Sequence, residues 1–157
     1  MIGRAAALGA AAGGIGVAAM TLGEKIEQGA TRRPNSYVPG RTLLALVGRR
    51  PGEQVKPTVA NHLMHWGTGI TLGALRGVWA VSGLRGPGWS LAHTGLRLMT
   101  DQTFENATGT GAPPPSWPSL ERRIDVLHKA VYSLVTGAVA DVLISPRPAN
   151  PVGRVSH

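Results

Sequence analysis

The side chains of this sequence that could carry acid–base or metal chemistry stand at the ends of its apolar stretches. Antiparallel threading of those stretches would bring an acid or a histidine from each of them to one level. Residues three apart, such as His62 and His65 or Asp125 and His128, lie on one face of a helix. The sequence therefore predicts one polar core, made of Glu24, His62, His65, Asp101, Glu105, Asp125 and His128.

Three kinds of chemistry fit this polar core, and the sequence leaves all three open. The first is structural, with charges that hold helices together near lipid headgroups. The second is a divalent metal site, because the Asp-x-x-His and His-x-x-His spacings are close to the Glu-x-x-His pairs of di-metal helix bundles. Its candidate ligands, in a membrane-embedded metalloenzyme, are Glu24, His65, Glu105 and His128. The third is proton or ion transfer between titrating histidines and carboxylates.

Hydrolytic chemistry is disfavoured, because Ser90 and Ser133 have no convincing arrangement of base and acid around them. Thiol catalysis, disulfides and zinc–thiolate sites are excluded, since the chain has no cysteine. The leading functional hypothesis is a non-enzymatic membrane protein, either an accessory subunit or a proton- or ion-handling component.

A second, deeper layer of charge is expected to form ion pairs. At 1.5 Å per residue, Arg76 lies roughly 16 Å beyond His65, and Asp141 roughly 20 Å beyond His128. The two reach similar depth, so the sequence predicts an Arg76–Asp141 pair. Arg97 and Asp101 are four residues apart and form a second possible pair. A charge buried without a partner would cost several kcal/mol, on the order that buried ion-pair mutants lose.

The elements that must position these groups are apolar stretches at about 5–24, 59–81, 89–105 and 124–144. They predict an all-α fold, an antiparallel four-helix transmembrane bundle packed through Gly and Ala, in one domain 1–145 with a disordered tail 146–157. Charged residues are 15% of the chain, against about 25% in soluble domains. A soluble helical bundle, a signal peptide at the first stretch and an amphipathic helix at the third are the alternatives.

Small residues four apart predict where the helices pack. Gly69, Gly73 and Gly77 form a flat ridge on the second stretch, and Ala5, Gly9 and Gly13 form another on the first. Such ridges let helix backbones approach closely in lipid. A ridge left exposed would favour a homo-oligomer or a membrane-protein partner, whereas a ridge used inside the bundle would not.

The basic residues predict location and orientation. Net charge is +8, and much of it lies in the connection 29–57. By the positive-inside rule, the loops 29–57 and 106–118 are cytoplasmic and both termini lie outside, in a multi-pass protein of the plasma (inner) membrane. Anionic lipid headgroups are the expected partner of the basic loop. Nucleic acid is not expected, because no recognition pattern accompanies the charge.

One segment resembles a known family. The Pro113–Pro118 turn leads into a helix that carries Glu121, Asp125, His128 and Tyr132, and Asn61-His62 begins an earlier histidine-bearing helix. This arrangement, over about a third of the chain, is similar to the YagU-like family of small bacterial inner-membrane proteins. The resemblance implies a multi-span inner-membrane protein with a link to acid tolerance. It implies no catalytic residue.

Overall fold

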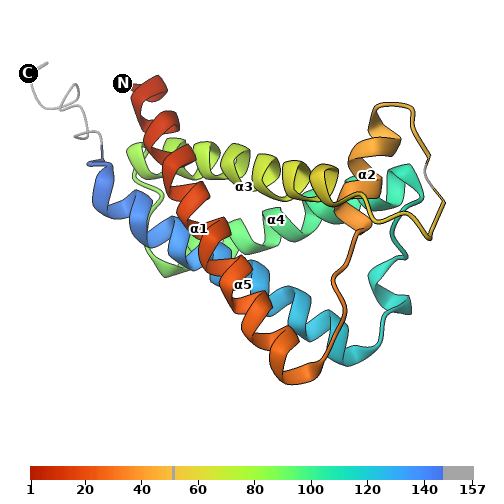
Figure 1. Cartoon of the computed structure of the whole chain (residues 1–157). Coiled ribbons are helices and arrows are strands. Elements are labelled where there is room, and N and C mark those ends of the chain that lie inside the picture. Colours follow the sequence, from red (N-terminus) through yellow and green to blue (C-terminus); the bar gives the residue numbers. More distant parts are fainter. Residues whose placement is uncertain (51, 147–157) are drawn as a thin grey trace, which may run out of the picture.

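The computed structural model describes residues 1–50 and 52–146, and all regular structure in these residues is helical. The predicted all-α class is therefore confirmed, while residues 147–157 of the predicted tail lie outside the described residues. Figure 1 shows the helices and their order. They are α1 (Ile2–Thr31), α2 (Val38–Leu46), α3 (Thr58–Val81), α4 (Pro87–Thr108), a 3-10 turn (Pro114–Ser116) and α5 (Ser119–Leu143).

Turn chemistry sets the helix ends more than apolarity does. α4 begins at Pro87, the first-turn position that proline favours, and stops at Gly109, which is left-handed with φ 69°. α1 runs well past the predicted end near residue 24, since Glu24, Lys25 and their neighbours are good helix formers. It stops at Arg32, which is left-handed. α2 occupies the basic connection between α1 and α3.

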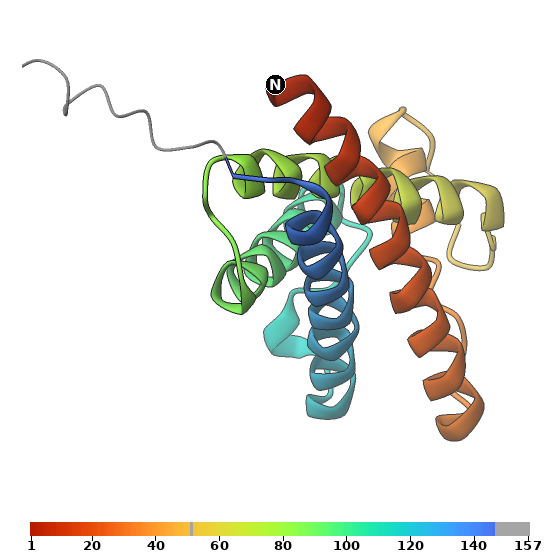
Figure 2. The same cartoon turned by 90° about the vertical axis from the view of Figure 1, so that its left-hand side faces the viewer.

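The helices do not form the predicted antiparallel four-helix bundle. α1 and α5 lie side by side in opposite directions, α4 packs on α5, and α2 packs on α3 and α4. α3 packs extensively on α1 but crosses it steeply, as Figure 2 shows. By length and apolar composition, α1 and α5 could cross a membrane, and the other described helices do not meet that measure. A core helix of a soluble protein, or a signal sequence, meets it as well.

The steep crossing has a local cause in the two predicted ridges, which pack against each other. A methyl group added at Gly73 would lie 2.5 Å from Gly13 Cα, and one added at Gly77 would lie 2.1 Å from the carbonyl oxygen of Ala5. Two flat ridges in backbone contact need no long side chains to interlock along the helices, so the axes are free to diverge on either side of the contact. The ridges are thus used within the chain.

Each of the other main helix contacts also contains a glycine. Gly16 of α1 faces Tyr132 and Thr136 of α5, and Gly137 of α5 faces Ser90 of α4. A Cβ at any of these glycines, or at Gly40 where α2 meets α3, would lie less than 3.0 Å from a neighbouring atom. Close backbone approach at small residues is the way in which helices associate in lipid.

The interior of the molecule is unusually polar and its surface unusually apolar. Among the described residues, four of the ten buried hydrophobic residues are alanines, and Tyr132 is the largest of the ten. Ten polar or charged residues are buried, namely Thr42, Arg76, Ser90, His93, Thr94, Arg97, His128, Lys129, Ser133 and Thr136. Large apolar side chains, such as Leu22, Leu63 and Leu91, are exposed. Buried charged residues such as Arg76, Arg97 and Lys129 are uncommon in a water-soluble domain.

Candidate functional site

A cavity of about 640 Å³ opens where the helices diverge. The end of α1 and the beginning of α5 extend to one side of it, and α3 and α4 extend to the other (Figure 1). The linker 33–39 and the segment 110–118 also line it. Every residue that the sequence grouped as a polar core lines this one cavity: Glu24, His62, His65, Asp101, Glu105, Asp125 and His128. Antiparallel threading of α4 and α5 and the position of α1 and α3 beside them bring these helix ends together.

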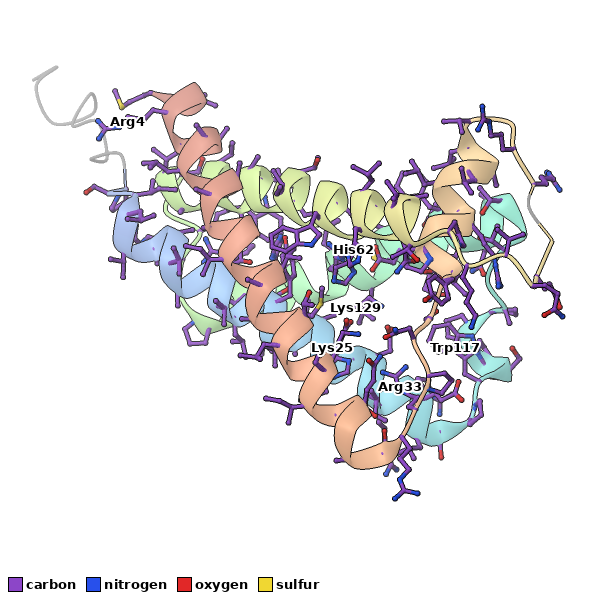
Figure 3. All side chains as sticks on the ribbon, viewed as in Figure 1. Arg4, Lys25, Arg33, His62, Trp117 and Lys129 are labelled. Atoms are coloured by element: carbon purple, nitrogen blue, oxygen red, sulfur yellow. The ribbon has the colours of Figure 1, made fainter. Side chains whose placement is uncertain are left out.

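The centre of the cavity wall is a lysine between two aspartates. Lys129 of α5 donates a hydrogen bond to the Asp125 carboxylate one turn earlier, and its Nζ lies 3.6 Å from Asp101 Oδ2 of α4. The residue is only 8% exposed. Figure 3 shows Lys129 with Lys25 and His62 around the opening between the helices. The ammonium thus joins carboxylates from two helices.

Arg97 is the second buried cation of the wall. Its Nε donates to Asp101 Oδ2 at 3.0 Å, which forms the predicted pair four residues apart. Its guanidinium lies 5.1 Å from the centre of the Tyr132 ring, a cation–π contact. Asp101 therefore forms ion pairs with both Arg97 and Lys129. Together with Asp125, these two cations and two carboxylates form a balanced group without net charge.

The remaining titratable groups of the polar core surround this balanced group. Nε2 of His65 lies 3.4 Å from the Thr21 hydroxyl, and Glu105 accepts one hydrogen bond of 3.4 Å from Gln102. Within the described residues, neither Glu24 nor Glu105 has a cationic partner within 4.0 Å. The carboxylates of Glu24 and Glu105 are therefore available in the cavity wall to bind a proton or a cation.

The candidate ligands of the predicted metal site do not come together. In the part of the chain that the structure describes, no three His, Asp or Glu side chains are placed so that they could hold a metal ion. Glu24, His65, Glu105 and His128 line the same cavity but do not converge on one point. Lys129 holds the neighbouring carboxylates of Asp101 and Asp125, which are not among the candidate ligands. The described residues do not assemble the candidate ligand set, and the metal site stays a prediction.

The rim of the cavity is held by ion pairs and hydrogen bonds of the connecting segments. Arg33 pairs with Glu27 at 2.8 Å, and Thr31 donates a hydrogen bond to the same carboxylate. The bonds from Arg33, and then that from Thr31, lower the pKa of Glu27 below its ordinary value. Nζ of Lys25 donates to Asn35 Oδ1 at 2.7 Å. These contacts fold the linker after α1 against the cavity.

The other end of the molecule carries the predicted deep pair. Arg76 Nη2 donates to both carboxylate oxygens of Asp141, at 2.9 and 3.0 Å. The backbone N–H of Gly86 donates to the same carboxylate at 2.8 Å. Arg85 binds the carbonyl oxygens of Asp141 and Ile144 at the end of α5. The arginine is fully buried and is satisfied in large part by this carboxylate.

Sequence reasoning missed two residues that organise the site. Lys129 stands four residues after Asp125 in an apolar helix, and that spacing was the available signal for an ion pair. Tyr132, also buried, donates from its hydroxyl to the carbonyl oxygen of Gly69 at 2.6 Å and stacks against Arg97. Its spacing already grouped it with Asp125 and His128, but its role was missed because its partners lie on α3 and α4.

Comparisons with protein-family models, curated proteins and solved structures find no match to this chain. The resemblance to the YagU-like family is therefore untested and stays a prediction. Function has to be argued from the cavity and from the distribution of side chains.

Proposed function

We propose that this chain is a multi-pass protein of the plasma (inner) membrane whose polar cavity takes up protons or small ions. The observation that carries the proposal is the distribution of side chains. Arg76 is fully buried and Lys129 nearly so, whereas many large apolar residues are exposed. In water, an exposed apolar surface of this kind would favour association with other molecules. In lipid, apolar side chains belong on the outside, and ionisable groups turn toward one another.

The same distribution supports crossing by α3 and α4 as well as α1 and α5. α4 buries His93 and Arg97 while Leu91 and Met99 are 60% and 68% exposed. The mean hydropathy of the whole helix combines a polar inner face with an apolar outer face, and it is therefore low. α3 behaves alike, since Arg76 is buried while Leu63 and Ile70 are exposed.

In the proposed orientation, the cavity and the basic loop face the cytoplasm, and both termini face outside. The loop carries Arg41, Arg49 and Lys56, which anionic lipid headgroups would bind. The steep course of α3 is compatible with crossing, because a tilted helix of 24 residues is long enough at 1.5 Å per residue.

The cavity chemistry favours uptake of a proton or cation over hydrolysis. Its wall combines Glu24 and Glu105, which have no cationic partner, with the balanced group around Lys129. Carboxylates of this kind in a membrane interior mark proton and ion routes. A purely structural role for the polar core remains the competing hypothesis, and it predicts no flux.

The topology can be tested with single cysteines, because the chain has none of its own. Gly3→Cys, Gly52→Cys, Ser82→Cys and Ala112→Cys place a thiol in each terminal or connecting segment. Four passes predict that a membrane-impermeant maleimide labels positions 3 and 82 from outside, and positions 52 and 112 only in inverted vesicles. If α1 and α5 alone cross, position 82 is labelled together with 52 and 112. Purification from the soluble fraction without detergent would contradict the proposal altogether.

The activity can be tested in liposomes that contain the purified protein and a dye sensitive to the ion under test, H⁺, Na⁺ or K⁺. A gradient of protons, Na⁺ or K⁺ should collapse faster than in protein-free vesicles. A Glu24→Gln/Glu105→Gln variant should slow that collapse, because it removes the two carboxylates without cationic partners while keeping their shape. Equal rates with and without protein for all three ions would leave only the structural role.

A further inference from the structure

Five buried polar atoms between the cavity and the Arg76–Asp141 pair have no hydrogen-bond partner among the described residues. They are Arg76 Nε, His93 Nδ1, Arg97 Nη1, Ser133 Oγ and Thr136 Oγ1. Each belongs to a side chain that is at most 3% exposed. Buried polar groups are almost always satisfied, and where protein atoms do not serve, ordered water does. A run of such atoms points to bound water.

These atoms lie along one continuous route. Starting at the cavity, Arg97 stacks on Tyr132, and the Tyr132 ring lies 5.5 Å from the His93 ring between centres. On α5, Ser133 and Thr136 follow Tyr132, and the Thr136 hydroxyl faces Gly16 of α1. On the antiparallel α4, Ser90 follows His93 by one turn.

The route ends at the deep ion pair. Arg76 Nη2 and the Ser90 hydroxyl both face Gly137, at 3.3 and 2.0 Å from the position that a Cβ would take there. Arg76 then binds Asp141, which Gly86 also contacts near the far end of the molecule. Polar groups from α3, α4 and α5 therefore connect the cavity with the opposite side.

The chemistry of the route favours a proton over a metal ion or an anion. Each guanidinium is neutralised by its own carboxylate, Arg97 by Asp101 and Arg76 by Asp141. Between these two pairs, the described residues hold no further carboxylate that could replace the hydration shell of a metal cation. Hydroxyl and imidazole groups both donate and accept, so water ordered by them can pass a proton along by reorientation.

We propose that bound water molecules link the cavity to the Arg76–Asp141 pair and that this water chain is the proton path through the protein. The inference rests on the proposed membrane function, which it narrows from ions in general to protons. It assigns Ser133 and Thr136 as the groups that hold the water in the middle of the path.

Two substitutions remove the hydroxyls without changing much volume: Ser133→Ala and Thr136→Val. Proton flux into liposomes should fall roughly tenfold or more in the double variant, which corresponds to a barrier raised by about 1.4 kcal/mol. Thr94→Val is the matched control, because this buried hydroxyl already donates to the Ser90 carbonyl oxygen. Its flux should stay at the level of the unaltered protein.

Water itself can be detected by X-ray hydroxyl-radical footprinting, which oxidises side chains next to bound water even when they are buried. We expect oxidation of Tyr132 and His93 in the folded protein, and less of it in the double variant. Absence of oxidation at both rings would overturn the water chain. Flux that the double variant does not change would also overturn it as the path, yet leave the proposed function standing. If the unaltered protein conducts neither protons nor Na⁺ nor K⁺, the proposed function is wrong instead.

Discussion

Lys129 is the residue on which the cavity wall depends. Its ammonium lies between Asp125 and Asp101, and Arg97 shares the second of these carboxylates. Two cations and two anions in a poorly hydrated wall attract each other strongly, but none of them is tolerable there alone. Under the proposed function, this tethered ammonium would compete with a cation that enters the cavity.

Removal of the lysine charge should therefore destabilise the fold. We expect Lys129→Met to lower the free energy of unfolding by about 3 kcal/mol, because it leaves buried carboxylate charge uncompensated. Thermal denaturation in detergent measures the change. The double variant Lys129→Met/Asp125→Asn should recover part of the loss, since it removes the uncompensated charge too. Lys25→Met is the control, because Lys25 is exposed and binds only amide side chains; an equal loss there would refute the argument.

Acid should loosen the rim at Glu27. Because Arg33 and Thr31 lower the pKa of this carboxyl in the folded protein, the stabilisation from its deprotonated form is complete above the unfolded-state pKa. It disappears as the pH falls through the folded-state value. Cleavage by trypsin after Arg32 should therefore quicken as the pH is lowered through the acidic range, once corrected for the enzyme's own pH response. The Glu27→Gln variant should be cleaved faster than the unaltered protein at neutral pH, and its cleavage should lose the extra dependence on pH. If the variant keeps this pH dependence, the cause does not lie at Glu27.

At the scale of helices, glycine decides which backbones meet. The contact of α1 with α3 is a meeting of two small-residue ridges, and single glycines mediate the contacts of α5 with α1 and α4. The gain comes from dispersion between closely packed backbones and not from removing apolar surface from water. On this flat surface α3 crosses α1 steeply (Figure 2).

A methyl group on the ridge should be costly, and one beside it should not. Gly73→Ala places a Cβ 2.5 Å from Gly13 Cα, where only backbone could yield. We expect a loss of roughly 1–3 kcal/mol, the usual range for overpacking. Gly67→Ala on the same helix meets nothing within 4 Å and should be neutral or stabilising by up to about 1 kcal/mol. Denaturation midpoints of the two variants give the comparison, and equal midpoints would contradict the ridge contact.

At the scale of the whole molecule, the solvent decides whether the side-chain distribution is favourable. Arg76, His93 and Arg97 are buried together, and large apolar residues face outward on α1, α3, α4 and α5. Lipid makes both halves of that distribution favourable at once, since apolar surface meets acyl chains and the interior satisfies the charges.

A charge placed on the outer surface should distinguish lipid from water. Ile15 is 49% exposed in the middle of the apolar part of α1. In a membrane, Ile15→Lys should cost roughly 2.5–3.5 kcal/mol and lower the inserted fraction; in water it should change stability by no more than about 0.5 kcal/mol. Ile26→Lys, beyond the apolar stretch and next to Lys25, is the control and should insert normally. Equal membrane yields of both variants would speak against a lipid-facing α1.

The sequence by itself determined the helical class, the helix ends that carry acids and histidines, the Arg76–Asp141 pair and the two glycine ridges. All of these follow from the rise and the 3.6-residue period of a helix, which are local properties. Only the tertiary structure decided that α3 crosses α1 steeply and that Lys129, not a metal ion, lies between Asp101 and Asp125. The Asp125–Lys129 pair is marked by its spacing of four residues, but the crossing and the approach of Lys129 to Asp101 depend on contacts between helices far apart in the chain.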